Sequence, residues 1–324
     1  MDVTSLAVSE KDIVQTYLRP LAIGWPGAYD LLDDCASITP APGQDIIVKT
    51  DPIRSGLHFF IDDQPSDIAW KALATNVSDI AAKAARPIAY TLALSFPNSP
   101  ERNWLESFST GLAEAQDAFG CILIGGDLDL KSDSLSISVT MFGEIPKGRM
   151  LRRGNAQPGD SIFVSGTLGD SAFGLHLRTK RVSADDITDY SDLALTRYLR
   201  PEPRLGLRSA LRSYARAATD ISDGLPNDLK SMCGISGLGA YINAEKLPFS
   251  AAMQNVAAMD FNRAISLVAK SDDYEILCAV PQENCEKFIS SARSGRVKVT
   301  KIGEFSSDSR IQLRIGLKKV IEWS

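Results

Sequence analysis

Residues 71–82 read Lys71-Ala72-Leu73-Ala74-Thr75-Asn76-Val77-Ser78-Asp79-Ile80-Ala81-Ala82, and this stretch decides how the rest of the chain is interpreted. Its small and apolar residues keep helical spacing, which predicts a long helix with Ser66 or Asp67 as N-cap and an end near residue 85. Asn76 and Asp79 are three residues apart, so they share one face of that helix. That face is otherwise apolar, so the amide and the carboxylate need partners. They are either a buried hydrogen-bonded pair or ligands.

Helical and strand patterns alternate outward from this helix, which predicts an α/β (α+β) protein. A strand over 45–49 delivers Thr50 and Asp51 at its C-terminal end, and a strand over 121–124 is followed at once by Gly125-Gly126-Asp127. A glycine-containing basic linker begins at Lys147, so we expect an N-terminal domain over 1–146 and a C-terminal domain over 147–324. Further elements are expected at 9–18, 88–96, 104–119, 135–145, 161–165, 170–177 and 274–280.

Composition narrows the class of protein. The chain has 324 residues and a formal net charge of −5, so a global basic field for nucleic acid is absent. The longest apolar run, 88–96, is too short to span a bilayer, and Met1–Leu6 carries no signal-peptide pattern. Five scattered cysteines without Cys-x-x-Cys spacing indicate reduced thiols and a cytoplasmic protein. With only two histidines in the chain, any metal must be held by oxygen.

Acidic residues stand where apolar segments end or on the small-residue helix. They are Asp33, Asp34, Asp51, Asp79, Asp127, Asp220 and Asp223. Carboxylates that converge repel one another and require cations. Mg²⁺ suits such oxygen ligands and usually bridges to substrate phosphates. Each acid alone could equally form a turn or cap a helix.

Ser222 and Asp223 precede a helix expected to begin near Leu225, so either could be its N-cap, or the segment could hold a phosphate. The familiar nucleotide motifs are missing: the chain has no P-loop and no strand-linked Gly-x-Gly-x-x-Gly. It also lacks the Gly-x-Ser-x-Gly elbow of α/β-hydrolases. A phosphate-handling site must therefore be of another kind.

Read together, several blocks resemble the thiamine-monophosphate kinase family. The blocks are Asp33-Asp34-Cys35-Ala36, Thr50-Asp51, Ser55-Gly56-Leu57-His58-Phe59, residues 71–82, Leu123-Ile124-Gly125-Gly126-Asp127, residues 153–160, Arg200-Pro201-Glu202-Pro203-Arg204, Asp220-Ile221-Ser222-Asp223-Gly224-Leu225 and Asp272-Asp273-Tyr274-Glu275. They occur in family order over roughly residues 10 to 280. The resemblance implies the two-domain aminoimidazole ribonucleotide synthetase-like fold, with an N-terminal mixed sheet and helices and a C-terminal α+β domain. It also implies ATP binding without a P-loop, dimerisation through the N-terminal domain and a homodimer.

The resemblance also implies roles for particular residues. The family's magnesium ligands match Asp34, Thr50, Asp51, Asp79, Asp127, Asp220 and Asp223. Its nucleotide-contacting positions match Gly126, Asp127, Arg153 and Ser222, and its substrate-contacting positions match His58 and Asp272. Mg²⁺ and ATP are therefore the implied cofactor and co-substrate. The reaction implied is ATP-dependent phosphorylation of thiamine monophosphate to thiamine diphosphate.

The chain departs from the family pattern at five positions, one of which is Asp272 in place of a usual Glu. Lys49 replaces a small hydroxyl residue, and its side chain cannot serve as a metal ligand. Leu32, Lys270 and Ser271 replace glycines, which alters the acceptor end of the site. Lys270 brings a positive charge that would repel a thiazolium ring, so weakened acceptor affinity is expected unless this side chain points to solvent. Two alternatives remain: a paralogue that uses ATP on a different acceptor, and a nucleotide-binding protein that has lost turnover.

Overall fold

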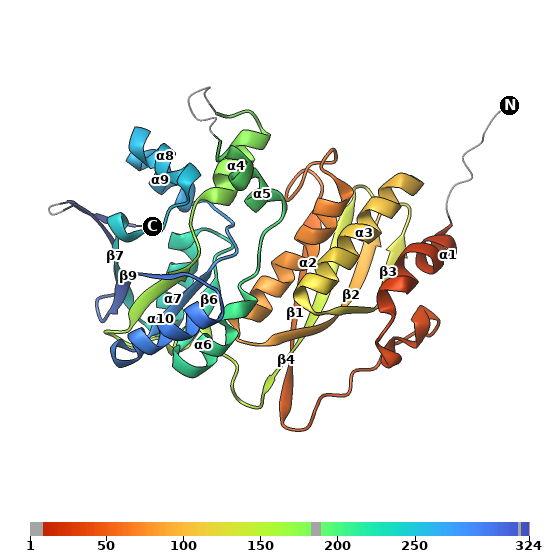
Figure 1. Ribbon diagram of the computed structural model, residues 1–324, viewed down its shortest axis with the longest axis horizontal. Helices are drawn as coiled ribbons and strands as arrows, with labels where there is room; N and C mark the ends of the chain where they lie inside the picture. Colours follow the sequence, from red (N-terminus) through yellow and green to blue (C-terminus); the bar gives the residue numbers. More distant parts are fainter. Residues whose placement is uncertain (1–8, 183–188, 317–318, 324) are drawn as a thin grey trace. The chain divides into compact units, whose positions relative to one another are not determined.

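The computed structural model describes residues 9–182, 189–316 and 319–323 and divides into two compact units (Figure 1). Unit 1 comprises Met1–Ile80 and Pro87–Pro146, and unit 2 comprises Ala81–Arg86 and Lys147–Ser324. Met1–Leu6, in which we expect no signal peptide, lies outside the described residues. Within the described part of the chain, no helix has both the length and the apolar character needed to cross a membrane.

Unit 1 is built on a mixed four-stranded sheet. Its strands lie in the order β1 (Gln44–Arg54), β4 (Ser136–Pro146), β2 (Arg86–Ser95) and β3 (Ile122–Asp129). β1 pairs antiparallel with β4, whereas β2 and β3 are parallel. The two helices α2 (Pro65–Ala82) and α3 (Arg102–Phe119) lie over this sheet (Figure 1).

Close packing joins the two helices of unit 1. Gly111 of α3 lies so near the backbone of Ser66 in α2 that a Cβ would overlap it. Trp70 and Phe119 meet edge to face with ring centroids 4.9 Å apart. As the sequence predicts, α3 ends at Gly120, which has a φ of 70° as its left-handed C-cap. The chain before the sheet forms α1 (Glu10–Ile13) with a Ser9–Asp12 capping box, then the short helices η1 (Val14–Leu18), η2 (Arg19–Ala22) and η3 (Pro26–Leu31).

Four local expectations, two for α2 and one each for β1 and β3, are wrong. α2 begins at Pro65, so Ser66 and Asp67 lie inside its first turn rather than at the cap. It ends at Ala82, since Ala84 takes a left-handed φ of 62°. β1 continues to Arg54 because its pairing with β4 continues, so Thr50 and Asp51 lie within the strand. β3 likewise continues beyond Ile124 through Gly125-Gly126-Asp127 because these residues pair with β2.

Unit 2 contains a seven-stranded mixed sheet. The strand order is β11 (Lys319–Glu322), β10 (Ile311–Ile315), β7 (Gly239–Asn243), β9 (Val299–Ser306), β5 (Ser161–Ser165), β8 (Ile276–Val280) and β6 (Ala217–Asp220). Helices are α4 (Asp170–Arg178), α5 (Ser191–Leu199), α6 (Arg208–Tyr214), α7 (Leu225–Ser236), α8 (Ala251–Met259), α9 (Phe261–Val268) and α10 (Cys285–Ser294). Every residue of β5, β6 and β8 is buried, as expected for strands covered on both faces.

The two faces of this sheet pack against different helices. Leu277 of β8 belongs to the same core cluster as Leu229 of α7. On the opposite face of β5, Phe163 meets Phe288 of α10 with ring centroids 5.3 Å apart. A second cluster joins α4, α5, α8 and α9, with Phe173 and Met253 at its centre. β6 and the start of α7 are therefore held rigidly by the core.

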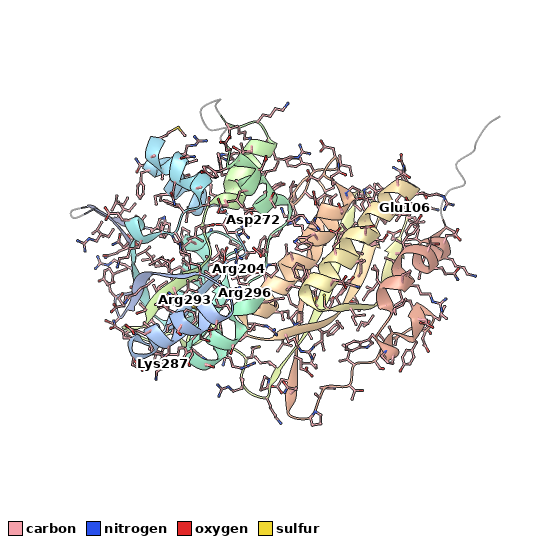
Figure 2. All side chains as sticks on the ribbon, in the orientation of Figure 1. Glu106, Arg204, Asp272, Lys287, Arg293 and Arg296 are labelled. Carbon is pink, nitrogen blue, oxygen red and sulfur yellow. The ribbon has the colours of Figure 1, made fainter. Side chains whose placement is uncertain are left out.

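A buried ion pair ties the middle of unit 2 together. Arg204 Nε donates to Glu275 Oε2 at 2.7 Å, and Ser165 Oγ donates to the same oxygen at 2.5 Å (Arg204 is labelled in Figure 2). Both partners are shielded, with side-chain exposures of 13% for Arg204 and 2% for Glu275. Burial acts to lower the pKa of Arg204, but the carboxylates of Glu275 and Glu202 outweigh it and raise the pKa above its usual range.

Asp273 closes the N-terminal end of α4. Its two carboxylate oxygens accept hydrogen bonds from Gly169 N at 2.7 Å and Ser171 N at 3.0 Å. Burial nevertheless raises the pKa of Asp273 to about 7, because these bonds only partly compensate the loss of solvent. The folded state therefore holds a proton that the unfolded chain releases at lower pH.

Asp273 should make the protein less stable as pH rises from about 4 to about 7. The pKa is raised on folding, so its contribution is fully present below the unfolded pKa and is lost as pH passes the folded one. The slope attributable to this group is about 1.4 kcal/mol per pH unit. Urea unfolding across this range should show a flatter profile for Asp273→Asn than for wild type. Asp192→Asn, the same change at an exposed site, is the control, and equal slopes for Asp273→Asn and wild type would contradict the prediction.

Candidate functional site

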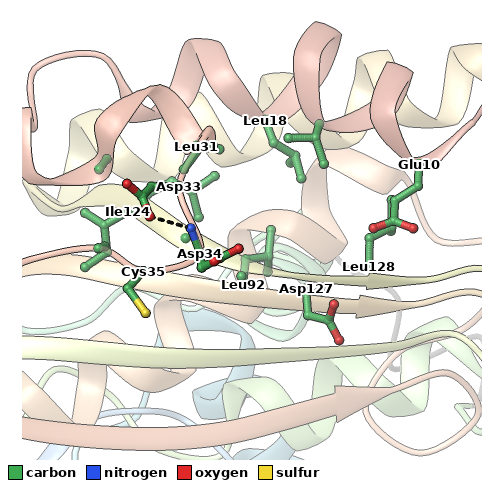
Figure 3. A pocket seen from close by; sticks show the side chains of 16 residues that line it. Glu10, Leu18, Leu31, Asp33, Asp34, Cys35, Leu92, Ile124, Asp127 and Leu128 are labelled. Carbon is green, nitrogen blue, oxygen red and sulfur yellow. Dashed lines mark hydrogen bonds between the residues drawn. The ribbon is translucent and has the colours of Figure 1, made fainter.

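Unit 1 contains a cavity of about 180 Å³ between its N-terminal segment and β3 (Figure 3). The apolar part of its wall includes Leu18, Leu31, Leu92 and Leu128. The polar part brings together acids from three separate segments: Glu10 from α1, Asp33 and Asp34 after η3, and Asp127 from β3. Two of the predicted metal ligands, Asp34 and Asp127, therefore line one cavity.

The charge of this cavity is one-sided. Four carboxylates line it, and none of its described lining residues is Lys, Arg or His. Asp33 Oδ1 accepts a hydrogen bond from the backbone N–H of Asp34 at 2.8 Å, which orients the two neighbours (Figure 3). Mg²⁺ is usually held by one or two carboxylates together with phosphate oxygens and water. Asp34 and Asp127 can supply the one or two carboxylates of such a set, so the cavity fits an ion that also binds phosphate oxygens and water.

Gly126 brings two backbones unusually close beside this cavity. It pairs with Leu92 of β2, and a Cβ at this position would overlap the carbonyl oxygen of Leu92. Gly125 has no such constraint, because a Cβ there would lie 3.8 Å from the Thr91 methyl group. The register of β2 against β3 therefore requires glycine at one position and only tolerates it at the other.

A second acidic pair of unit 1 carries its own cation. Lys49 Nζ lies 3.0 Å from Asp51 Oδ2 and 3.0 Å from Asp79 Oδ2. Burial acts to lower the pKa of Lys49, but the two carboxylates outweigh it, so the pKa is raised and the side chain is an ammonium ion at neutral pH. These carboxylates do not fit a metal ion while Lys49 holds this position.

Asn76 fixes the backbone of β1 next to this pair. The fully buried Asn76 side chain accepts a hydrogen bond from Asp51 N at 3.0 Å through Oδ1. Its Nδ2 donates to Ala72 O at 3.1 Å. Asn76 and Asp79 were expected either to bind each other or to be ligands. In the structure the Asn76 amide binds the backbone of β1, and the Asp79 carboxylate pairs with Lys49.

Thr50 and His58 are placed differently from these acids. Successive strand residues point to opposite faces, and Thr50 Oγ1 lies 2.9 Å from Thr140 Oγ1 on the face away from Asp51. His58 follows β1 in an exposed turn, and its Nδ1 accepts a hydrogen bond from Arg54 N at 3.0 Å.

In unit 2, the other predicted ligands gather where β6 leads into α7. Asp220 is buried at the end of β6. Neither Ser222 nor Asp223 caps α7; Gly224 is its N-cap, with a φ of 93°. Instead, Asp228 Oδ2 accepts hydrogen bonds from Ser222 N at 3.1 Å and Asp223 N at 3.0 Å. Burial raises the pKa of Asp228 to about 6.

Arg153 and Asp272 are held by neighbouring hydroxyl groups of unit 2. Arg153 Nε donates to Thr219 Oγ1 at 2.9 Å, which places its guanidinium group beside the end of β6. Ser171 Oγ donates to Asp272 Oδ1 at 2.5 Å (Asp272 is labelled in Figure 2). Lys270 is exposed, which favours the alternative that its side chain points to solvent. Among the described residues neither Lys270 nor Ser271 has a positive φ.

Sequence reasoning missed three participants. Asp228 gave no signal, because an acid in the first turn of a helix is usual. Glu10 gave no signal of a site either, since it lies in the acidic first turn of the helix expected at 9–18. Lys49 was noticed as a departure, but its two partners were not. Over residues 9–182, 189–316 and 319–323, the structure brings no three His, Cys, Asp or Glu side chains close enough to hold a metal ion by themselves.

Family models match most of the chain. The AIR synthase related protein N-terminal domain matches residues 32–145, and the AIR synthase related protein C-terminal domain matches residues 157–316. Together with the mixed sheets of both units, these matches confirm the predicted aminoimidazole ribonucleotide synthetase-like fold.

Relatives of similar length give a narrower assignment. Thiamine-monophosphate kinase from Caulobacter vibrioides is 39% identical over 92% of this chain and 84% of its own length. The crystal structure of the Stenotrophomonas maltophilia K279a thiamine-monophosphate kinase is 36% identical, covers 87% of this chain and 89% of its own, and superposes with a TM-score of 0.79. A structure of AaThiL complexed with AMPPCP and TMP is 30% identical over 90% of both chains, with a TM-score of 0.76.

Replacing Gly126 with alanine should lower the free energy of unfolding by about 3 kcal/mol, because the new Cβ forces β2 and β3 apart. Gly125→Ala is the matched control and should change stability by less than about 1 kcal/mol. Chemical denaturation of the two variants measures both values. Equal stability of the two would show that the close approach to Leu92 does not constrain the sheet.

Proposed function

Because this chain belongs to the thiamine-monophosphate kinase family, we propose that it transfers the γ-phosphoryl group of ATP to the phosphate of thiamine monophosphate. The observation that carries the proposal is the cavity lined by four carboxylates and by no cationic residue among those described. Such a cavity suits a polyphosphate chain that arrives with Mg²⁺. A relative has been captured with both AMPPCP and TMP, which is the pair of ligands that this reaction requires.

We assign metal binding in unit 1 to Asp34 and Asp127, supported by their place in the cavity. In unit 2 we assign it to Asp220 and Asp223, supported by their place between β6 and α7. When bound, Mg²⁺ neutralises phosphate charge during transfer. Of the remaining candidates of the resemblance, Asp51 and Asp79 pair with Lys49, and Thr50 lies on the opposite face of β1.

Nucleotide contacts are assigned to Gly126, Asp127, Arg153 and Ser222. Gly126 exposes backbone to the cavity without a side chain in the way. The Nε of Arg153 is already bonded to Thr219, so its planar guanidinium group is oriented before a phosphate arrives. Asp228 fixes the backbone of Ser222, which keeps this hydroxyl at the start of α7.

Acceptor binding is assigned to His58 and Asp272. The His58 ring is oriented by the bond from Arg54 N, and the Asp272 carboxylate by the hydroxyl of Ser171. A carboxylate can attract the cationic ring of the acceptor, and Lys270 two residues earlier opposes it. Activity on a different acceptor would show as ATP consumption that thiamine monophosphate does not stimulate.

Asp127→Asn should abolish thiamine diphosphate formation, because it removes one of the negative charges that the cavity offers a metal. The melting temperature of the metal-free protein should be unchanged or raised, since repulsion among the cavity acids decreases. Chromatography measures the thiamine diphosphate formed from ATP, Mg²⁺ and thiamine monophosphate. Asp129→Asn, two residues later on β3 and outside the cavity lining, is the matched control. Wild-type turnover in Asp127→Asn would remove Asp127 from the site.

We also propose that the protein is a homodimer that pairs through unit 1. One face of β1 presents Val48, Thr50 and Pro52, and the Val48 side chain is 58% exposed. A single exposed apolar residue is normal on a protein surface, so the family resemblance supports the dimer and Val48 only marks the face to test. All five cysteines are free, which supports a cytoplasmic location for the dimer.

Light scattering at micromolar concentration should give a mass of about 70 kDa, twice the 35.1 kDa of one chain. Val48→Lys should shift the mass toward that of the monomer, because it places a charge on the exposed face of β1. Val320→Lys, an equally exposed valine in unit 2 at 56% exposure, should leave the mass unchanged. A monomeric wild type would refute the dimer.

A further inference from the structure

The Lys49 ammonium group lies between two carboxylates that come from different elements of unit 1. Its Nζ atom is 3.0 Å from an oxygen of Asp51 on β1 and 3.0 Å from an oxygen of Asp79 on α2. The side chains are 32%, 43% and 16% exposed for Lys49, Asp51 and Asp79, so the group is partly shielded from water. One cation thus bridges two anions at the boundary between a strand and a helix.

The backbone geometry of β1 and α2 fixes the positions of these three side chains. Lys49 and Asp51 are two residues apart on β1, so both point to the same face of the sheet. Asp79 lies one helical turn beyond Asn76, and Asn76 binds the backbone N–H of Asp51. The strand and the helix are therefore fixed in register where the three charges meet.

Charge and space at this point accommodate one cation. Two carboxylates carry a charge of −2, and the ammonium group reduces it to −1. Each carboxylate already gives one oxygen to Nζ, at the distance of a direct ion pair. A divalent ion that bridged the same two oxygens would have to displace the ammonium group, since both cations would need the same position. The acid-only cavity near Asp127 has no comparable internal cation among its described lining residues.

We propose that Lys49 is a resident cation that replaces a metal ion between Asp51 and Asp79, so that this chain binds one divalent ion fewer than its acids alone would allow. Lys49 is thus a positioning residue: it holds Asp51 and Asp79 together without a metal. Thr50 points to the opposite face and takes no part. The inference concerns the site of the proposed function, but it is tested without ATP or thiamine monophosphate and can fail independently.

The first test counts bound Mn²⁺ by electron paramagnetic resonance in nucleotide-free protein. Lys49→Ser opens the space between the two carboxylates and should bind one more Mn²⁺ per chain than wild type. Adding Asp79→Asn to Lys49→Ser should abolish that gain, which locates the ion. Lys147→Ser removes the same charge at an exposed position and should bind as wild type does. Equal Mn²⁺ counts for wild type and Lys49→Ser would overturn the proposal.

The second test measures melting temperature in a chelator and then in excess Mn²⁺. Lys49→Ser should melt lower than wild type in the chelator, because the two carboxylates then repel, and Mn²⁺ should restore the loss. Lys49→Met keeps the aliphatic chain but not the charge, so it should melt lower and gain no rescue. Lys49→Arg should behave as wild type. A Lys49→Met variant that melts at or above the wild-type temperature in the chelator would overturn the role of the ammonium group, even if Lys49→Ser failed to fold.

Discussion

Repulsion between neighbouring carboxylates is the constraint on which the rest of this structure depends. Some shielded acids have a cationic partner, namely Glu275 with Arg204, Asp160 with Arg216 and Asp79 with Lys49. Others, such as Asp273 and Asp228, accept hydrogen bonds from backbone N–H groups instead. The cavity beside β3 is different, since its four carboxylates have no cationic residue among the described lining. An internal cation marks Glu275, Asp160 and Asp79 as acids that serve the fold. We propose that the cavity acids, which lack one, take an external cation.

The acids are presented by backbone that polar side chains hold in place. Asn76 binds the N–H of Asp51 in unit 1, and Asp228 binds the N–H groups of Ser222 and Asp223 in unit 2. In both cases a helix residue reaches the segment that carries a candidate ligand. A buried N–H without such a partner costs about 1–3 kcal/mol, so these bonds are part of the stability of each unit. Phosphoryl transfer depends mainly on positioning, which is what this arrangement provides.

The sequence predicted elements best where local chemistry ends them. Gly120 stops α3 as expected, and β5 spans the predicted residues 161–165. The ends of β1 and β3 were missed, because their polar or glycine residues break the local pattern while pairing with a neighbouring strand continues. The contact of Lys49 with Asp79 could not be predicted from the sequence either. It depends on the register of a strand against a helix thirty residues away, and no local pattern encodes that.

Two of the lost family glycines show why a departure from a motif need not loosen a site. Ser271 is fully buried, and its hydroxyl oxygen accepts a hydrogen bond from Ala172 N at 3.1 Å, which glycine could not do. Asp272 accepts a hydrogen bond from the Ser171 hydroxyl, and Asp273 accepts one from the backbone N–H of Gly169. Three consecutive side chains therefore hold the start of α4, and no described residue from Lys270 to Asp273 needs a positive φ. This segment is more constrained than a glycine pair would be, so the change from glycine does not add flexibility.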